Sequence, residues 1–180
     1  MEENLKWKNE ELVRLKPEEF QKTEKIAVVI VLDNIRSLYN VGSVFRSADA
    51  FLVQAIYLCG ITATPPHREI QKTALGASET VAWKYFESTR LALESLKEEG
   101  FYIYCIEQTK SSVMLQDTVI NKTQKIALVF GNEVKGVDQE IINSSDGCIE
   151  IPQFGTKHSF NISVSAGIVL WEIYKKMYLK

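Results

Sequence analysis

The longest uninterrupted apolar run of the chain is IAVVIVL at residues 26–32, closed by Lys25 on one side and Asp33 on the other. Most of its residues are β-branched, and no polar residue alternates with the apolar ones. Such a run is typical of a strand that is buried on both faces, as in a parallel sheet covered by helices. We therefore expect residues 26–32 to form a central strand of such a sheet.

Outward from this run, strand and helix patterns alternate to the C-terminus, which favours the α/β class, with a mostly parallel sheet flanked by helices. Residues 4–22 have the pattern of a short amphipathic helix that Pro17 breaks or restarts. We expect an N-terminal helical extension over residues 1–25 and one domain over residues 26–180. Further strands are predicted at residues 55–58, 81–86 (a sheet edge), 101–106, 126–130 and 148–151, and helices at residues 40–51, 68–75, 89–98, 138–142 and 161–180.

The composition is that of a folded globular protein, with 46% hydrophobic and 24% charged residues among 180. The net charge is −2. A protein that holds nucleic acid mainly by neutralising phosphates is usually more basic than this. Nucleic acid would therefore have to meet a local positive face, or be recognised largely by shape and chemistry.

Three cysteines, Cys59, Cys105 and Cys148, lie far apart, each within an apolar stretch. Their odd number and their spacing argue against a disulfide framework or a zinc site, and favour buried thiols in a reducing cytoplasm. The longest apolar run is too short to span a bilayer. The start Met1-Glu2-Glu3 lacks the pattern of a secretory signal. We expect a cytoplasmic protein without a membrane partner.

A first group of polar residues follows the predicted central strand: Asn40-x-Gly42-x-x-x-Arg46. Asn40 is a natural N-cap for the predicted helix. Helical side chains lean toward the N-terminus, so Arg46 is expected to reach back across Gly42, where no side chain blocks it, toward Asn40. This would place a cation and an amide beyond a strand end, where α/β sheets bind ligands. The alternative is a capped helix with a solvated arginine.

A second group is the glycine-bounded loop GNEVKG at residues 131–136, directly after a predicted buried strand. Two glycines permit unusual backbone conformations and the close approach of a ligand. The residues after Gly136 exclude a phosphate-binding P-loop, and the spacing excludes a dinucleotide fingerprint. The alternative is a turn without a ligand.

A third group is the loop IPQFGTKHSFN at residues 151–161, which leads into the last helix. Ser159 or Asn161 can cap that helix, and Phe154 and Phe160 offer apolar surface for a flat ring such as adenine. The alternative is an ordinary loop whose aromatic residues plug the core. The histidines in this loop and at position 67 have no metal-ligand spacing, so no metal is expected.

Together, in this order, the three groups resemble the three motifs of the SpoU/TrmH-type RNA 2′-O-ribose methyltransferases of the SPOUT superfamily. The first match is Asn40-x-Gly42-x-x-x-Arg46, preceded by LDNIR at residues 32–36. The second is LVFGNE at residues 128–133 with Gly136, and the third is Ile151-Pro152-x-x-Gly155 followed by SFNISV at residues 159–164. The segment TALGA at residues 73–77 also looks like one that these enzymes carry. The resemblance covers residues 26–174, nearly the whole chain.

The resemblance implies a C-terminal trefoil knot that holds S-adenosyl-L-methionine, and a homodimer in which each active site draws on both subunits. It implies that Asn40 and Arg46 lie at the reacting hydroxyl and that Glu133 organises the site. Two departures, Phe160 in place of leucine and Gln153 in place of methionine, remove no reacting group but could reshape the adenine pocket. The resemblance also implies that Ser159 and Asn161 line the reaction site. The residues implied to bind the cofactor are Gly131, Ile151, Phe160, Asn161, Val129, Asn132 and Pro152.

The sequence leaves the RNA open: tRNA is the first expectation and rRNA the second. Two other functions remain as alternatives, namely a non-catalytic RNA-binding module that retains the fold and a nucleotide-dependent oxidoreductase. The missing dinucleotide fingerprint argues against the oxidoreductase. Basic residues expected to form a discontinuous RNA-binding face are Lys6, Lys8, Arg14, Arg36, Arg68, Lys72 and Lys157.

Overall fold

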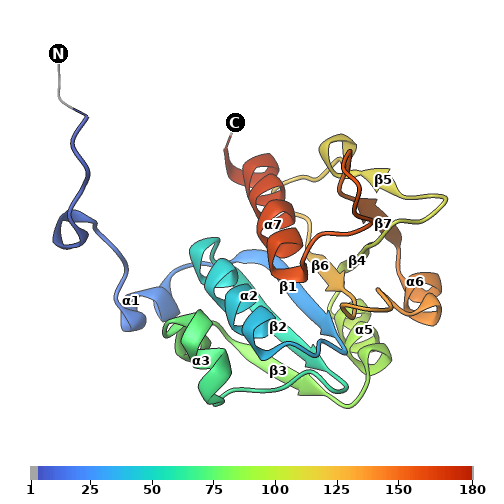
Figure 1. Ribbon diagram of the computed structural model, residues 1–180, viewed down its shortest axis with the longest axis horizontal. Helices are drawn as coiled ribbons and strands as arrows, with labels where there is room; N and C mark the ends of the chain where they lie inside the picture. Colours follow the sequence, from blue (N-terminus) through green and yellow to red (C-terminus); the bar gives the residue numbers. More distant parts are fainter. Residues whose placement is uncertain (1–3, 180) are drawn as a thin grey trace.

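The structure, a computed structural model, describes residues 4–179 and contains a seven-stranded sheet in the order β3-β2-β1-β6-β4-β7-β5 (Figure 1). Every pair of neighbouring strands is parallel. The expected α/β class is therefore confirmed. Residues 1–3 of the expected extension and Lys180 of the expected last helix lie outside the described residues. The strands are β1 (Ile26–Asp33), β2 (Val53–Cys59), β3 (Trp83–Phe86), β4 (Tyr102–Ile106), β5 (Val113–Met114), β6 (Ile126–Phe130) and β7 (Gly147–Glu150).

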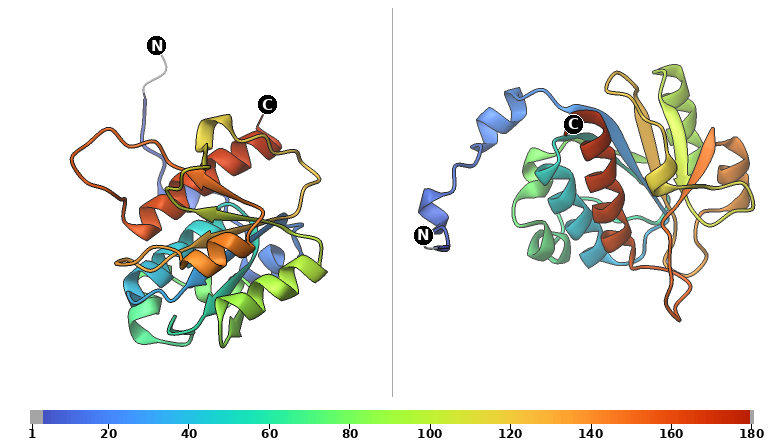
Figure 2. Two further views of the ribbon diagram at one scale, coloured as in Figure 1. Left: turned by 90° about the vertical axis from the view of Figure 1, so that its right-hand side faces the viewer. Right: turned by 90° about the horizontal axis from the view of Figure 1, so that it is seen from above.

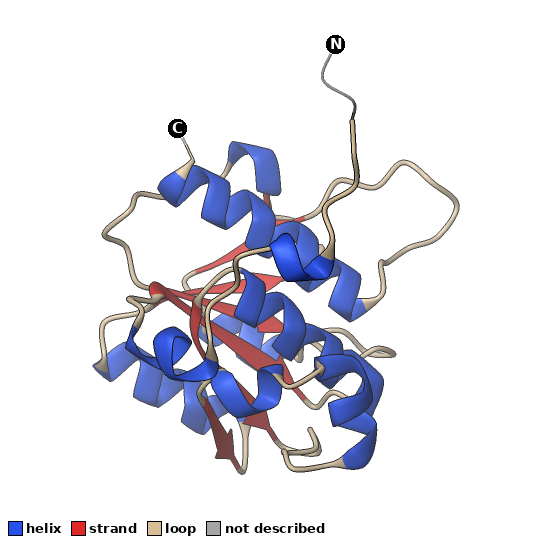
Figure 3. Cartoon of the chain, turned by 90° about the vertical axis from the view of Figure 1, so that its left-hand side faces the viewer, coloured by secondary structure: helices blue, strands red, loops and turns tan. Residues whose placement is uncertain are grey.

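Helices cover both faces of the sheet (Figure 3). Along β1, Ile30 and its alternate neighbours pack with α2, α3 and α7, whereas Val29 and Val31 pack with α5 and α6. This explains why the central strand is apolar at consecutive positions, because each face needs its own apolar side chains. The helices are α1 (Pro17–Lys22), α2 (Leu38–Ala50), α3 (Arg68–Ala74), α4 (Ala77–Thr80), α5 (Thr89–Glu98), α6 (Gln139–Ser144) and α7 (Ile162–Tyr178), with 3-10 helices η1 (Asn9–Glu11) and η2 (Leu115–Asp117).

The prediction of a helix across residues 4–22 is wrong for its first part. Only the 3-10 turn η1 and the helix α1, which begins at Pro17, are present, and the segment before α1 extends away from the body (Figure 2). The side chains of Trp7 and Val13 are 69% and 93% exposed. An amphipathic segment without a surface for its apolar face gains too little to offset helix nucleation. Phe20 in α1 has such a surface and is buried.

Two further predictions concern α2. The helix begins at Leu38, and its N-cap is Ser37, whose Oγ accepts a hydrogen bond from the backbone N–H of Asn40. The N-cap predicted at Asn40 is therefore wrong by one turn. Gly42 does not leave an open gap: it is buried against α3, where an added Cβ would lie 2.1 Å from Thr73 Oγ1 and 2.3 Å from the Ile70 carbonyl oxygen. The gap predicted for Arg46 is thus filled by another helix.

The two edges of the sheet differ in how well the sequence predicted them. The edge strand expected within residues 81–86 is confirmed as β3, whereas the two-residue strand β5 at the opposite edge was missed because it is too short to show a pattern.

All three cysteines are free and buried, as expected. No helix within residues 4–179 is long and apolar enough to cross a membrane. The trefoil knot that the resemblance implies stays a prediction.

Candidate active site

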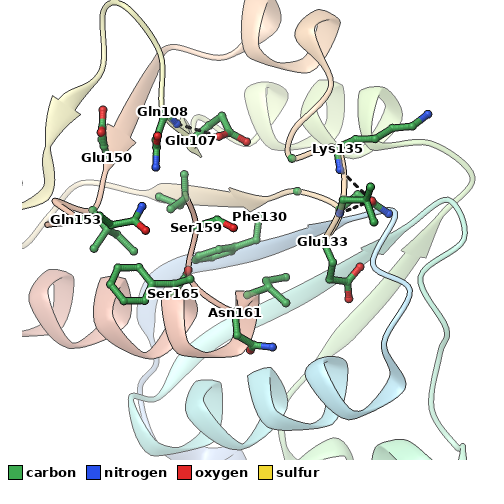
Figure 4. Close-up of a pocket in the computed structure, with 18 residues that line it drawn as sticks. Glu107, Gln108, Phe130, Glu133, Lys135, Glu150, Gln153, Ser159, Asn161 and Ser165 are labelled. Atoms are coloured by element: carbon green, nitrogen blue, oxygen red, sulfur yellow. Dashed lines mark hydrogen bonds between the residues drawn. The ribbon is translucent and has the colours of Figure 1, made fainter. Parts of the chain in front are cut away.

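A cavity of about 540 Å³ lies at the carboxyl ends of β6, β4 and β7, three adjacent strands of the sheet (Figure 4). The loops that leave these strands and the first turn of α7 form its walls. In a parallel sheet all strands end on the same side, so loops from distant parts of the sequence converge there. The predicted site residues that line this cavity are Gly131, Asn132, Glu133, Ile151, Ser159, Phe160 and Asn161.

The loop after β6 is a tight, internally bonded turn. The backbone N–H of Asn132 donates to the Gly136 carbonyl at 3.0 Å, and the Gly136 N–H returns a bond to Asn132 at 2.8 Å. Gly136 has φ +71°, a conformation that glycine adopts without steric cost. At Gly131 an added Cβ would lie 2.1 Å from the Gly136 carbonyl carbon. Both glycines are therefore required by the turn itself.

The carboxylate of Glu133 collects three hydrogen bonds from the segment that follows β1. The backbone N–H groups of Arg36 and Ser37 and the side-chain amide of Asn40 each donate to it at 3.0 Å. Burial raises the pKa of Glu133, but these hydrogen bonds, and one from its own backbone N–H, bring the pKa below its ordinary value. Glu133 is thus an anion at neutral pH and orders its neighbours rather than accepting a proton.

The hydrogen bonds of Glu133 and Asn40 continue to Asn161 at the start of α7, and we call this Glu133–Asn40–Asn161 series the polar chain. Asn161 Nδ2 donates to Asn40 Oδ1 at 3.1 Å, so Asn40 accepts from one partner and donates to the other. Asn161 also caps α7, because its Oδ1 accepts from the backbone N–H of Ser163 at 2.9 Å. The structure therefore brings together Glu133, Asn40 and Asn161, three residues from three separate sequence motifs.

Four predicted residues do not line the cavity. Asn40 contacts it only through the polar chain, and Pro152 lies beside it, next to the lining residue Ile151. Val129 is fully buried in β6 and packs with the core on the α5 and α6 face. Arg46 is exposed on α2 and is not among the residues that line the cavity.

The two loop phenylalanines and the two histidines differ in their surroundings. Phe160 lines the cavity and is 42% exposed, whereas Phe154 is 97% exposed and does not line it. His67 caps α3 through Nδ1, which accepts from the Glu69 backbone N–H at 3.2 Å. Among the described residues, the one hydrogen bond of His158 is made by its carbonyl oxygen, which accepts from Gln108 Nε2 at 2.8 Å.

Sequence reasoning missed the wall that follows β4. Ile106, Glu107 and Gln108 line the cavity, as does Glu150 at the end of β7. A signal was available, because a polar pair directly after a predicted parallel strand lies at the ligand-binding edge of the sheet. With Glu133, these residues give the cavity three carboxylates against the single ammonium of Lys135, an electrostatic surface that favours a cationic ligand.

A family model described as the SpoU rRNA Methylase family matches residues 27–171 of the chain. The chain belongs to the SpoU rRNA methylase family. The match spans all three motifs and the whole sheet except Ile26, the first residue of β1. The resemblance deduced from the motifs is thereby confirmed.

Among relatives of this SpoU-family chain, a 23S rRNA (guanosine-2′-O-)-methyltransferase of Neisseria meningitidis is 33% identical over 153 residues. These cover 85% of the chain but only 60% of that relative. A crystal structure of the TrmH/SpoU tRNA modifying enzyme of A. aeolicus is 25% identical with a TM-score of 0.78, covering 89% of the chain and 81% of the enzyme. An AdoMet-bound rRNA methyltransferase of Sinorhizobium meliloti, 23% identical, shares the fold with a TM-score of 0.78 over 87% of the chain and 59% of its own.

Proposed function

We propose that the chain transfers a methyl group from S-adenosyl-L-methionine to a ribose 2′-hydroxyl of RNA, either tRNA or rRNA. Family membership and the names of the relatives support the reaction class. The observation that carries the proposal is the polar chain Glu133–Asn40–Asn161 at the edge of a cavity formed by the second and third motifs. The chain spans less than two thirds of several relatives, 60% of one and 38% of another, so its substrate remains a proposal.

The residues of the cavity fit the proposed cofactor. Ile106, Phe130, Ile151 and Phe160 supply apolar surface for the adenine ring. The carboxylate of Glu150 can accept a hydrogen bond from a ribose hydroxyl or from the amino group, and the charge of the three carboxylates favours a sulfonium. When bound, this cofactor supplies an electrophilic methyl group.

The protein's own residues contribute by aligning the ribose with the methyl group and by placing a positive charge near the reacting oxygen. In this mechanism Asn40 is fixed by Glu133, Asn161 is fixed by its cap on the first turn of α7, and both orient the incoming ribose. Such alignment can supply a large share of a rate enhancement. An arginine resists deprotonation, so Arg46 acts as a cation that stabilises the developing alkoxide or holds the adjacent phosphate. The proton leaves through phosphate or water.

Arg46 also bears on the proposed assembly. It lies outside the cavity of its own chain, so the proposed mechanism requires a homodimer in which the partner's Arg46 completes each site. α2 and α7 lie side by side (Figure 1), and Val164 and Trp171 of α7 are about half exposed, at 48% and 50%. Apolar side chains on a helix face are typical of a homodimer interface.

The proposed RNA-binding face extends from the cavity mouth to the N-terminal segment. Arg36 follows β1 beside Glu133, and Lys157 lies on the exposed loop before α7. Lys72 is already paired with Glu69 at 2.8 Å, which reduces its value for phosphate contact. Residues 1–25 are proposed as an extension that adds Lys6, Lys8 and Arg14 to this face, and the proposed location is the cytoplasm.

Transfer of tritiated methyl groups to tRNA and to rRNA from cells that lack this protein tests the proposal. We expect incorporation at ribose 2′-oxygens by the wild-type chain and at least a hundredfold loss in Arg46→Ala, while calorimetry shows unchanged binding of S-adenosylhomocysteine. Arg90→Ala, an exposed arginine on α5, is the matched control. Equal turnover by Arg46→Ala would contradict the role of Arg46. RNA binding without any transfer would favour the non-catalytic module.

A further inference from the structure

Two loops line the cavity proposed for the cofactor, residues 131–138 after β6 and residues 151–161 before α7, and we call them the cofactor loops. The segment directly after β4 makes hydrogen bonds to both. Glu107 and Gln108 lie across the cavity from Glu133 and Asn161 (Figure 4). Neither residue belongs to one of the three motifs, and both make hydrogen bonds that cross from one loop to another.

Glu107 fixes the loop after β6. Its Oε2 accepts from the backbone N–H of Val137 at 3.0 Å, and its Oε1 accepts from the Gln108 N–H at 2.9 Å. A Cβ on Gly136 would lie 2.2 Å from Glu107 Oε2, so the carboxylate sits directly against the glycine backbone. A hydrogen bond to a carboxylate is stronger than one between neutral groups. Glu107 therefore anchors the C-terminal end of this loop, whereas Glu133 anchors its middle.

Gln108 fixes the loop before α7. Its Nε2 donates to the His158 carbonyl at 2.8 Å. Within the described chain, this is the one hydrogen bond that joins residues 152–160 to other residues. The other residues of that loop are largely exposed. The loop carries Phe160 and Ser159 of the cavity, so this bond joins the part of the loop next to two lining residues to the wall after β4.

We infer that Glu107 and Gln108 are positioning residues that hold the two cofactor loops at a fixed separation, Glu107 through Val137 and Gln108 through His158. The inference rests on the proposed function, because it assumes that the ligand of the cavity is S-adenosyl-L-methionine. Neither side chain acts on the methyl group or the ribose. Loss of either bond therefore weakens cofactor binding and leaves turnover at saturating cofactor nearly unchanged.

Four variants separate the two bonds. Glu107→Ala removes both acceptors, whereas Glu107→Gln keeps one oxygen that can accept from Val137. Gln108→Glu is nearly isosteric but cannot donate to a carbonyl, and Gln108→Ala removes the side chain. Matched controls are Glu98→Ala and Gln71→Ala, both at exposed helical positions without a side-chain hydrogen bond.

We expect KM for S-adenosylmethionine to rise about tenfold in Glu107→Ala and about fivefold in both Gln108 variants. We expect kcat to change less than twofold, and Glu107→Gln to recover most of the loss. Calorimetry with S-adenosylhomocysteine should give the same order. In the ligand-free chain, trypsin should cleave after Lys157 at least threefold faster in Gln108→Glu than in wild type. The two controls should match wild type in every measurement.

The outcomes distinguish this inference from the function on which it rests. If the wild-type chain binds no S-adenosylhomocysteine, the proposed function fails, while the trypsin comparison still tests the Gln108 bond. If the wild-type chain binds it and the Glu107 and Gln108 variants bind equally well with unchanged cleavage, the inference is overturned and the proposed function stands. A fall in kcat at constant KM would also overturn it, because that would place these residues in the chemistry.

Discussion

The two glycine-containing loops of the cavity are held in different ways. The loop after β6 bonds to itself through Asn132 and Gly136 and is anchored through Glu133 and Val137. The loop before α7 has a single hydrogen bond to other residues along positions 152–160 of the described chain. The first loop is therefore built before any ligand arrives, whereas the second keeps conformational freedom that a ligand must remove.

This difference assigns different roles to residues of the same type. A glycine in the first loop is required by close backbone contact, but Gly155 in the second has no atom within 4 Å of an added Cβ. Phenylalanines in the second loop likewise divide into Phe160, which lines the cavity, and Phe154, which faces solvent. Substitutions in the two loops should therefore have unequal effects.

The largest difference is expected between Gly131→Ala and Gly155→Ala. A Cβ at Gly131 would meet backbone atoms at 2.1 Å and 2.2 Å that cannot move aside alone. We expect Gly131→Ala to lower the free energy of unfolding by about 1–3 kcal/mol and to abolish cofactor binding. Gly155→Ala should stay within about 0.5 kcal/mol of wild type. Urea denaturation and calorimetry measure both, and equal effects would end the distinction between the loops.

The next effect concerns the charge of Glu133. We expect Glu133→Gln to cost about 1 kcal/mol at pH 7, after allowance for the solvent exposure of the carboxylate, and to reduce methyl transfer at least tenfold. The folded-state pKa lies below the ordinary value of 4.5, so this stabilisation is fully present above pH 4.5 and is lost as the pH falls through the folded-state pKa. Urea midpoints of wild type and variant should therefore converge in acid. A constant gap would show that the charge is not what stabilises the loop.

A smaller effect separates the two tasks of Asn161. Asn161→Ala loses the cap of α7 and should cost about 1 kcal/mol. Asn161→Asp keeps an oxygen for the Ser163 N–H but cannot donate to Asn40, so its thermal midpoint should stay near wild type while methyl transfer falls. Thermal melts followed by circular dichroism, together with the transfer assay, test this pair. Full activity in Asn161→Asp would remove the bond to Asn40 from the mechanism.

The smallest effect is expected at Phe154. Its side chain is 97% exposed and does not line the cavity, so Phe154→Ala should change stability by less than about 0.5 kcal/mol and cofactor affinity by less than twofold. Phe160→Ala is the comparison and should weaken S-adenosylhomocysteine binding measurably. A large loss of affinity in Phe154→Ala would show that the second loop closes with Phe154 over the ligand.

Prediction from sequence succeeded where neighbouring residues alone indicate the local structure. The apolar run of β1 predicted a strand buried on both faces, and Gly136 predicted a special backbone conformation. It failed where the outcome depended on a distant segment. Gly42 was expected to face an open gap but packs against α3, and residues 4–16 were expected to be helical but have no surface to cover.

The sequence alone determined the family, the α/β sheet and the identity of the motif residues, because the apolar pattern of a buried strand and the glycines of a tight turn are visible in the local sequence. Only the tertiary structure decided that Glu133 bonds to Asn40 and Asn40 to Asn161, pairs that lie 93 and 121 residues apart. It also added Glu107 and Gln108 to the cavity. Contacts across parallel strand ends are set by strand order and loop path, which no local spacing records.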